Sequence, residues 1–140
     1  MSAPPKKHPI NPPTLVKPIG FAHGWLVVDD TGSRRTLYLA GQCGYDREGR
    51  IVAVGDLVGQ LDKAMANIGE VLSASGLAFP DLVQLNFYVT SRDDYTTARK
   101  AFGDVWRRYC SSHYPAMAMF MVAGLFDPQA VIEIQGIAAR

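Results

Sequence analysis

One acidic side chain stands out as a candidate for catalysis. Glu133 lies in the run VIEI, residues 131–134, where its three companions are apolar. A carboxylate in such a strand is expected to be partly buried, and burial raises its pKa because the charged form loses hydration. A carboxylate with a raised pKa can accept a proton from water, so Glu133 is a candidate general base. The alternative is a structural ion pair across a subunit interface.

Four other side chains could take part in chemistry at the same site. Arg99 is either a solvated residue of a surface helix or a cation that reaches into a cleft and binds an anion. His23 and His113 either line that cleft or are neutral surface histidines. Cys43 follows a Gly-Gln pair and has no firmly placed basic neighbour, so we expect an inert thiol.

Composition limits the partners of the chain. Its 140 residues are 48% hydrophobic and 19% charged, with a formal net charge of +1, which is typical of an ordinary globular domain. A near-neutral charge gives no reason to expect nucleic acid as a partner. Cys43 and Cys110 are too few and too far apart for a disulfide framework or a CxxC metal site. We expect no metal and no cofactor.

The N-terminal segment predicts neither export nor membrane insertion. Residues 1–18 contain six of the nine prolines and are expected to form an extended arm, followed by a single domain over 19–140. The arm lacks the apolar core of a signal peptide, and no run reaches the roughly 18 apolar residues of a membrane span. We therefore expect a cytoplasmic protein without a membrane partner.

The elements that must position Glu133 follow from periodicity. A hairpin is predicted over 25–42, with Asp30 and Gly32 in its turn. A helix capped by Asp56 should end at Gly76, and a second helix should follow the Asp93–Asp94 pair. Alternating apolar residues predict a strand near 81–91 and two final strands at 116–125 and 130–139. This order favours an α+β fold, a mixed sheet with two helices on one face.

The strand that begins at Ala116 is apolar on both faces. Three methionines, at positions 117, 119 and 121, alternate with smaller or aromatic residues. Packing explains the methionines better than a metal site does. A sheet covered by helices on one side must bury its second face against a partner subunit or a ligand, so we expect an oligomer, with the methionine face uncovered in the monomer.

Several stretches resemble one known family. They are LYLAGQCGYDREGRI, the helix with Gln60 and the segment ANIG, VQLNFYVTSRDDY, HYPAM and VIEIQGIA, which together cover residues 19–139. This pattern is similar to the YjgF/RidA family of reactive intermediate deaminases, also called endoribonuclease L-PSP. The resemblance implies a homotrimeric barrel of chorismate-mutase-like subunits (bacillus type), with a small-molecule ligand in each intersubunit cleft. It also implies hydrolysis of enamines and imines.

The resemblance assigns site residues and shows departures from the usual pattern. Glu133 matches the carboxylate that holds the attacking water, and Gly41 lies where backbone N–H groups polarise the substrate. Met117 stands where active imine deaminases have an arginine that binds the substrate carboxylate, and a thioether cannot replace that guanidinium.

Three further positions of the implied pocket also differ, namely Phe21 in place of tyrosine, Ala40 in place of serine and Arg99 in place of asparagine. The sequence therefore predicts an enzyme of this family that is not a typical 2-imino acid deaminase. The alternative is a non-catalytic trimer that binds a metabolite in the same cleft.

Overall fold

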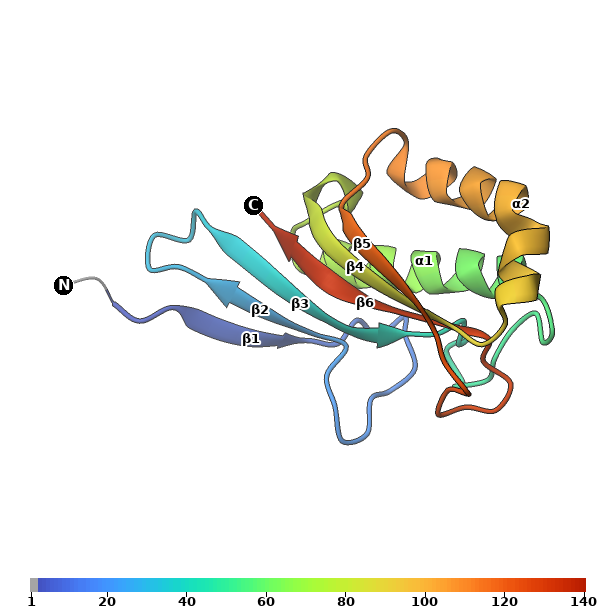
Figure 1. Ribbon diagram of the computed structural model, residues 1–140. Helices are drawn as coiled ribbons and strands as arrows, with labels where there is room; N and C mark the ends of the chain where they lie inside the picture. The colour runs from blue at the N-terminus through green and yellow to red at the C-terminus, as the bar shows by residue number, and fades with distance from the viewer. Residues whose placement is uncertain (1–2) are drawn as a thin grey trace.

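The computed structural model describes residues 3–140 and consists of one sheet and two helices (Figure 1). The strands are β1 (Lys6–Ile10), β2 (Gly24–Val28), β3 (Arg35–Gln42), β4 (Leu82–Val89), β5 (Ala116–Met121) and β6 (Ile132–Ala139); the helices are α1 (Leu57–Ala74) and α2 (Arg92–Cys110), with a 3₁₀ turn at Phe79–Asp81. The predicted α+β class, a mixed sheet with two helices, is confirmed.

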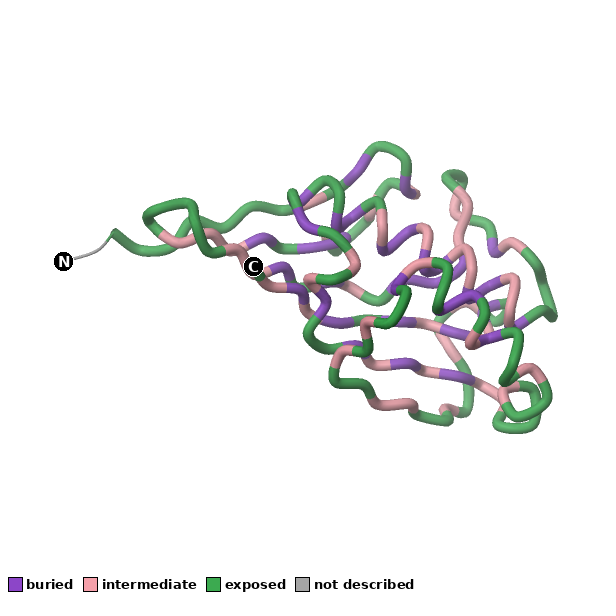
Figure 2. The backbone as a smooth tube through the Cα atoms, turned by 90° about the horizontal axis from the view of Figure 1, so that it is seen from above, coloured by how far each residue is buried: buried purple, intermediate pink, exposed green. Residues whose placement is uncertain are grey.

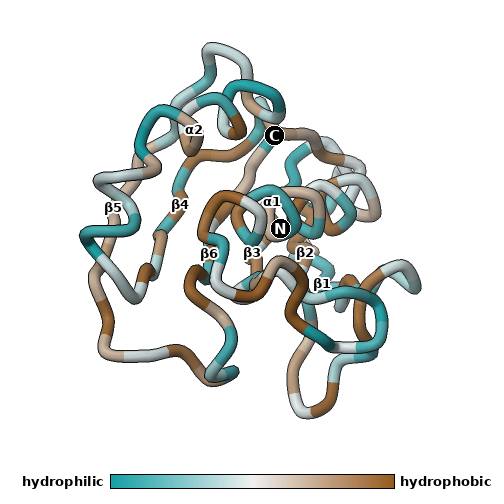
Figure 3. The backbone as a smooth tube through the Cα atoms, turned by 90° about the vertical axis from the view of Figure 1, so that its right-hand side faces the viewer, coloured by the Kyte–Doolittle hydropathy of each residue, from teal (hydrophilic) through white to brown (hydrophobic). Residues whose placement is uncertain are grey.

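The six strands form a single sheet in the order β1-β2-β3-β6-β4-β5, which can be followed across Figure 3. All neighbouring pairs are antiparallel except β4 and β5, which are parallel. The last strand therefore does not pair with the strand before it; β6 inserts between β3 and β4 at the centre of the sheet. This central position places Glu133 between two strands from other parts of the chain.

The proline-rich N-terminal segment contains a strand that periodicity did not predict. Residues of β1 pair with β2 from Lys6↔Val28 to Ile10↔Gly24. The strand lies at the edge of the sheet, where the missing N–H of Pro9 can be tolerated. Leu15, which follows it, is buried in the main core. The segment is extended, as expected, but it is part of the sheet.

Both helices cover one face of the sheet (Figure 1). Asp56 caps α1 as predicted, because its carboxylate accepts a hydrogen bond from the N–H of Gly59. Helix α2 begins one turn earlier than expected, since Ser91 caps it and the two aspartates lie in its first turn. The buried residues run along the sheet and the helices, whereas the N-terminal end and the loops are exposed (Figure 2). No helix within residues 3–140 is long and apolar enough to cross a membrane.

The expectation that the methionines of β5 lie on the face of the sheet away from the helices is wrong, although Met117 and Met121 are 44% and 37% exposed. Met117 pairs with Leu85 and Met119 with Phe87, and both partners are buried in the core under the helices. Because paired residues share a face of the sheet, the methionines point toward α2. The open face instead carries the aromatic residues Trp25, Tyr38 and Phe120, which are 46–52% exposed, together with Tyr88, which stacks on Phe120.

Candidate functional site

Glu133 projects from the open face of β6, because its neighbours Ile132 and Ile134 occupy the buried face. The pairing of β3 with β6 is irregular between Leu39 and Gln42, where two residues of β3 lie opposite one residue of β6. This bulge places Gly41 directly beside Glu133, and a Cβ atom at position 41 would overlap the carboxylate. Glycine at this position therefore makes room for the acidic side chain.

A cavity of about 570 Å³ surrounds the Glu133 carboxylate. It brings together four residues that the sequence predicted for the site, namely Phe21, Ala40, Gly41 and Glu133, together with Cys43. The remaining wall residues are Val16, Lys17, Ile19, Tyr45, Gly49, Phe126 and Asp127. We name this space the Glu133 cavity. Its volume falls in the range of small-molecule sites.

Two buried amides of α1 hold the backbone on both sides of the Glu133 cavity. Gln60 is fully buried; its Oε1 accepts from the N–H of Val131 at 2.9 Å, and its Nε2 donates to the carbonyl of Gln129 at 3.0 Å. Asn67 Nδ2 donates to the carbonyls of Cys43 and Tyr45, both at 3.1 Å. The helix thus fixes the segment before β6 and the segment after β3.

Burial controls the protonation of the groups in the Glu133 cavity. The half-buried position of Glu133 raises the pKa of its carboxyl group above the usual 4.5. Burial, reinforced by Glu133 and Asp127, raises the pKa of Cys43 to about 12, so the thiol stays protonated and is a poor nucleophile. Burial also raises the pKa of Tyr45 to about 12, with smaller contributions from Cys43 and Asp127. Glu133 is therefore better suited than Cys43 to exchange a proton with water.

No ion pair fixes the Glu133 carboxylate within residues 3–140. The carboxylate also accepts no hydrogen bond within this part of the chain, although every buried polar side chain nearby is engaged. A partly desolvated carboxylate with free acceptor atoms can bind and orient a water molecule.

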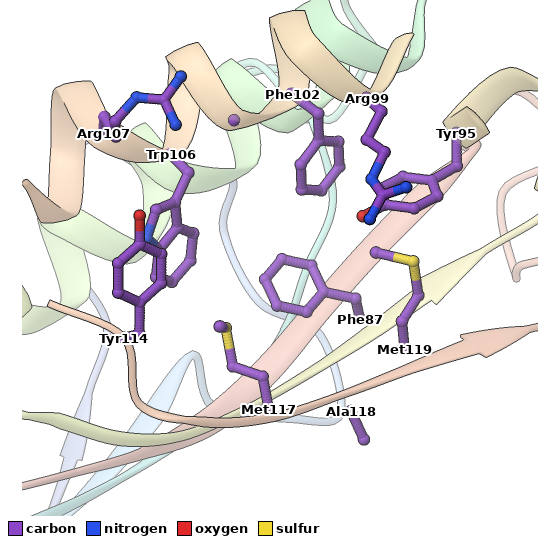
Figure 4. Close-up of a pocket in the computed structure, with 11 residues that line it drawn as sticks. Phe87, Tyr95, Arg99, Phe102, Trp106, Arg107, Tyr114, Met117, Ala118 and Met119 are labelled. Atoms are coloured by element: carbon purple, nitrogen blue, oxygen red, sulfur yellow. The ribbon is translucent and has the colours of Figure 1, made fainter. Parts of the chain in front are cut away.

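Arg99 and Met117 lie in a second cavity, about 510 Å³ in volume, between α2 and the edge strand β5 (Figure 4). Its other wall residues are Phe87, Tyr95, Phe102, Gly103, Trp106, Arg107, Tyr114, Ala118 and Met119. We name this space the α2–β5 cavity. It shares no wall residue with the Glu133 cavity. The predicted site residues therefore form two groups within one chain.

The two histidines have structural roles. His23 is buried; its Nε2 lies 2.7 Å from the carbonyl oxygen of Val16 and its Nδ1 lies 3.3 Å from Nε2 of Gln42. Both ring nitrogens are thus occupied, and the ring holds the segment that carries Phe21. His113 Nε2 lies 2.7 Å from the carbonyl oxygen of Leu82 and anchors the loop before β5.

Sequence reasoning missed Lys17, Tyr45 and Asp127 in the Glu133 cavity. It also missed that Trp106 and Tyr114 line the other cavity. Trp106 is buried in the core, as the apolar spacing of α2 predicts, and that spacing gives no sign of a cavity beside it. Tyr114 lies in the loop between α2 and β5. Gly103, a glycine in the interior of α2, was the one feature of the sequence that could have indicated a cavity beside this part of the helix. Within the described part of the chain, no group of three His, Cys, Asp or Glu side chains could hold a metal ion.

Comparison with protein families gives one match, to the model described as "Endoribonuclease L-PSP", over residues 27–140. Among curated proteins, the 2-iminobutanoate/2-iminopropanoate deaminase of Capra hircus is 33% identical over 106 residues, which cover 76% of this chain and 74% of that protein. The deaminase of the same name from Homo sapiens is 30% identical over the same shares of both chains.

Solved structures share the architecture. RidA from the Antarctic bacterium Psychrobacter sp. PAMC 21119 superposes with a TM-score of 0.78 at 25% identity, over 94% of this chain and 98% of that one. E. coli TdcF, solved with bound serine, gives a TM-score of 0.77 at 24% identity, over 95% and 98% of the two chains. The latter similarity supports the fold alone.

Proposed function

The chain belongs to the endoribonuclease L-PSP family, which includes the RidA and YjgF proteins, and from this premise we propose that it hydrolyses an enamine or imine. Glu133 is the proposed general base. The observation that carries the proposal is the half-buried Glu133 carboxylate, which has a raised pKa and lies beside Gly41 in a cavity of small-molecule size.

The chemistry needs one group that takes and returns a proton. The carboxylate of Glu133 accepts a proton from water as the water oxygen bonds to the carbon of the protonated imine, which gives a neutral carbinolamine. The resulting carboxylic acid returns that proton to the nitrogen. As the C–N bond breaks, the hydroxyl oxygen forms the carbonyl group and its proton passes to the Glu133 carboxylate and then to solvent, so that a carbonyl compound and an amine or ammonia leave. A raised pKa favours this return step because it brings the proton affinity of the acid closer to that of the intermediate.

We further propose that the protein works as a homotrimer of chorismate-mutase-like subunits, in which each cleft combines the Glu133 cavity of one subunit with the α2–β5 cavity of the next. The separation of the two groups of site residues within one chain favours this assembly. Apolar residues at the rim of the Glu133 cavity also favour it: Ile19 is 86% exposed, Phe21 53% and Phe126 100%. Burial of these apolar side chains against a neighbouring subunit would be energetically favourable.

The substrate is not a typical small 2-imino acid in this proposal. Met117 points into the α2–β5 cavity (Figure 4), and its thioether offers no charge-assisted hydrogen bond to a carboxylate. Arg99 lines the same cavity and can approach an anion from α2 instead. The 2-iminobutanoate/2-iminopropanoate activity named for the relatives is therefore expected to be weak here.

A coupled assay tests the proposal. 2-Iminobutyrate, 2-aminoacrylate and an imine of an aromatic 2-keto acid, each generated enzymatically in situ, are offered to the full chain while loss of the imine is followed. Catalysed loss of at least one imine, abolished in Glu133→Gln, supports a hydrolase. A trimer that binds such compounds without accelerating their loss would instead be a metabolite-binding protein that uses the same cleft.

A further inference from the structure

The wall of the α2–β5 cavity has an unusual composition for a site that handles small imino acids. Five of its side chains are aromatic and two are methionines, and they face one another across the cavity (Figure 4). The rings belong to Phe87, Tyr95, Phe102, Trp106 and Tyr114. Aromatic and thioether groups favour contact with flat apolar surfaces over contact with a two- or three-carbon compound.

The rings pack on one another, and Phe102 and Trp106 of α2 line the side of the cavity that faces the sheet. Phe87 lies 6.0 Å from Phe102 and 6.1 Å from Trp106 between ring centroids, and both pairs are tilted. Tyr114 stacks on Trp106 with an interplanar angle of 18° and closes one end of the cavity. Met117 and Met119 rise from β5 on the opposite side, together with Phe87, which pairs with Met119 in the sheet (Figure 4). The space between these two sides suits a planar ring.

The charge of the cavity is positive. Its charged wall residues are Arg99 and Arg107, and no wall residue is acidic. Arg107 is engaged with Asp104 at 2.6 Å. Arg99 has no ion-pair partner within residues 3–140, and its side chain extends from α2 toward the cavity (Figure 4). One guanidinium is thus available for an anion at the open end.

Two local features of α2 also favour a ligand. Gly103 lies in the cavity wall in the interior of the helix, where glycine costs about 1 kcal/mol relative to alanine. The nearest atoms to an added Cβ belong to the flexible Arg107 guanidinium, so helix packing does not require glycine here. The indole N–H of Trp106 is buried without a hydrogen-bond partner in the described residues. This unpartnered donor belongs to a residue of the cavity wall.

We propose that the α2–β5 cavity binds aromatic carboxylates, with the ring between the methionines and the aromatic wall and the carboxylate on Arg99. The inference depends on the proposed function in one respect: it takes aromatic carboxylates to be the substrate class of the shared cleft. Binding itself requires neither Glu133 nor turnover, so the two proposals can fail separately.

The test measures binding to the full chain by titration calorimetry, with 2-naphthoate as the probe. Its uncharged analogue 2-naphthalenemethanol keeps the ring, and propionate keeps the carboxylate. We expect saturable binding of 2-naphthoate, binding of the alcohol weakened by about fivefold, and none of propionate up to about 5 mM. Absence of saturable 2-naphthoate binding overturns the proposal. Equal binding of propionate would also overturn it, because the site would then recognise an anion alone.

Variants assign the binding to the cavity. Arg99→Ala should weaken 2-naphthoate by about fivefold and leave the alcohol unchanged, whereas Arg92→Ala, on the same helix but outside the cavity wall, should change neither. Met117→Trp should fill the space and abolish binding of both compounds, while Met121→Trp, on the same face of β5 outside the wall, should not. Normal binding by folded Met117→Trp contradicts the proposal. Arg99 is exposed, so Arg99→Ala should fold normally. Its effect on binding therefore decides the question even if Met117→Trp does not fold.

A trimer that takes up none of the probe would show that the neighbouring subunit fills the cavity. This outcome also overturns the proposal. Light scattering on the same sample identifies it.

Discussion

The side chain of Glu133 fills the space that a Cβ atom on Gly41 would occupy. Gly41 lies in the bulge of β3, where two residues of this strand lie opposite one residue of β6. The carboxylate and the backbone N–H groups that would polarise a substrate are therefore positioned by the same local feature.

This relationship predicts the effect of Gly41→Ala. The added methyl group must displace the Glu133 carboxylate, so we expect kcat/KM for the responsive imine to fall about tenfold or more, with little change in the melting temperature. Gly124→Ala is the matched control, because an added Cβ at position 124 meets nothing within 4 Å. Full activity of Gly41→Ala would mean that the position of the carboxylate is not critical.

The second prediction concerns Gln60, the buried amide that holds the segment before β6. Gln60→Leu leaves the N–H of Val131 and the carbonyl of Gln129 without their partner. An unsatisfied buried group costs about 1–3 kcal/mol, and because these two bonds are only partly buried we expect a loss at the lower end of that range. Urea titration should show this loss in the free energy of unfolding. The exposed Gln129→Leu serves as the control, and equal stability of both variants would assign Gln60 no role in holding the site.

The third prediction concerns Met117. Wild type should hydrolyse 2-iminobutyrate at least about 100-fold less efficiently than an arginine-bearing family member, since a lost bidentate contact costs about 3 kcal/mol. Met117→Arg should recover part of this activity, although like charge from Arg99 in the same cavity limits the gain. Met121→Arg, on the same face of β5 outside the cavity wall, should recover none.

Strong wild-type turnover of 2-iminobutyrate would contradict that account of position 117. Arg99 is then the first candidate for the carboxylate anchor. An Arg99→Ala variant with an unchanged KM would exclude this explanation as well.

The fourth prediction concerns the shared cleft. Light scattering should give about three times the chain mass of 15.3 kDa. Glu133→Gln and Met117→Trp should each be inactive alone, because each damages one half of every cleft. The two variants are then unfolded, mixed in equal amounts and refolded. In the random trimers that form, about a quarter of the clefts have both halves intact. About a quarter of wild-type activity should therefore return. No recovery in mixed trimers would place the whole site within one chain.

Much of the fold follows from the sequence because local signals agree with the final packing. Asp56 marks the start of α1, and the alternation of Ile132 and Ile134 with Glu133 sets the faces of β6. The N-terminal strand escapes prediction because prolines obscure its pattern and only pairing with β2 defines it. The face of β5 could not be assigned, because both sets of its side chains are apolar and the choice depends on register with Leu85 and Phe87.

The candidate site, like the fold, follows only in part from the sequence. The acidic residue among apolar neighbours identifies Glu133 without a structure, because an unpartnered carboxylate in a strand is costly. The separation of Arg99 from Glu133 depends on the position of β6 between β3 and β4, which local sequence does not encode. Trp106 has the spacing of a core residue and is buried in the core, yet it also lines the α2–β5 cavity together with Tyr114 of the following loop.

The most direct test of the account is kcat/KM of wild type and Glu133→Gln, measured across pH on whichever imine responds in the panel. In the proposed mechanism Glu133 acts as a base in its ionised form, and burial raises the pKa of its carboxyl group, so ionisation requires a higher pH than for an exposed glutamate. Wild-type kcat/KM should therefore fall as the pH drops through this pKa. Glu133→Gln should be about 100-fold less active at neutral pH and should lack this dependence, while remaining a folded trimer. A Glu133→Gln variant with wild-type kcat/KM would contradict the central claim.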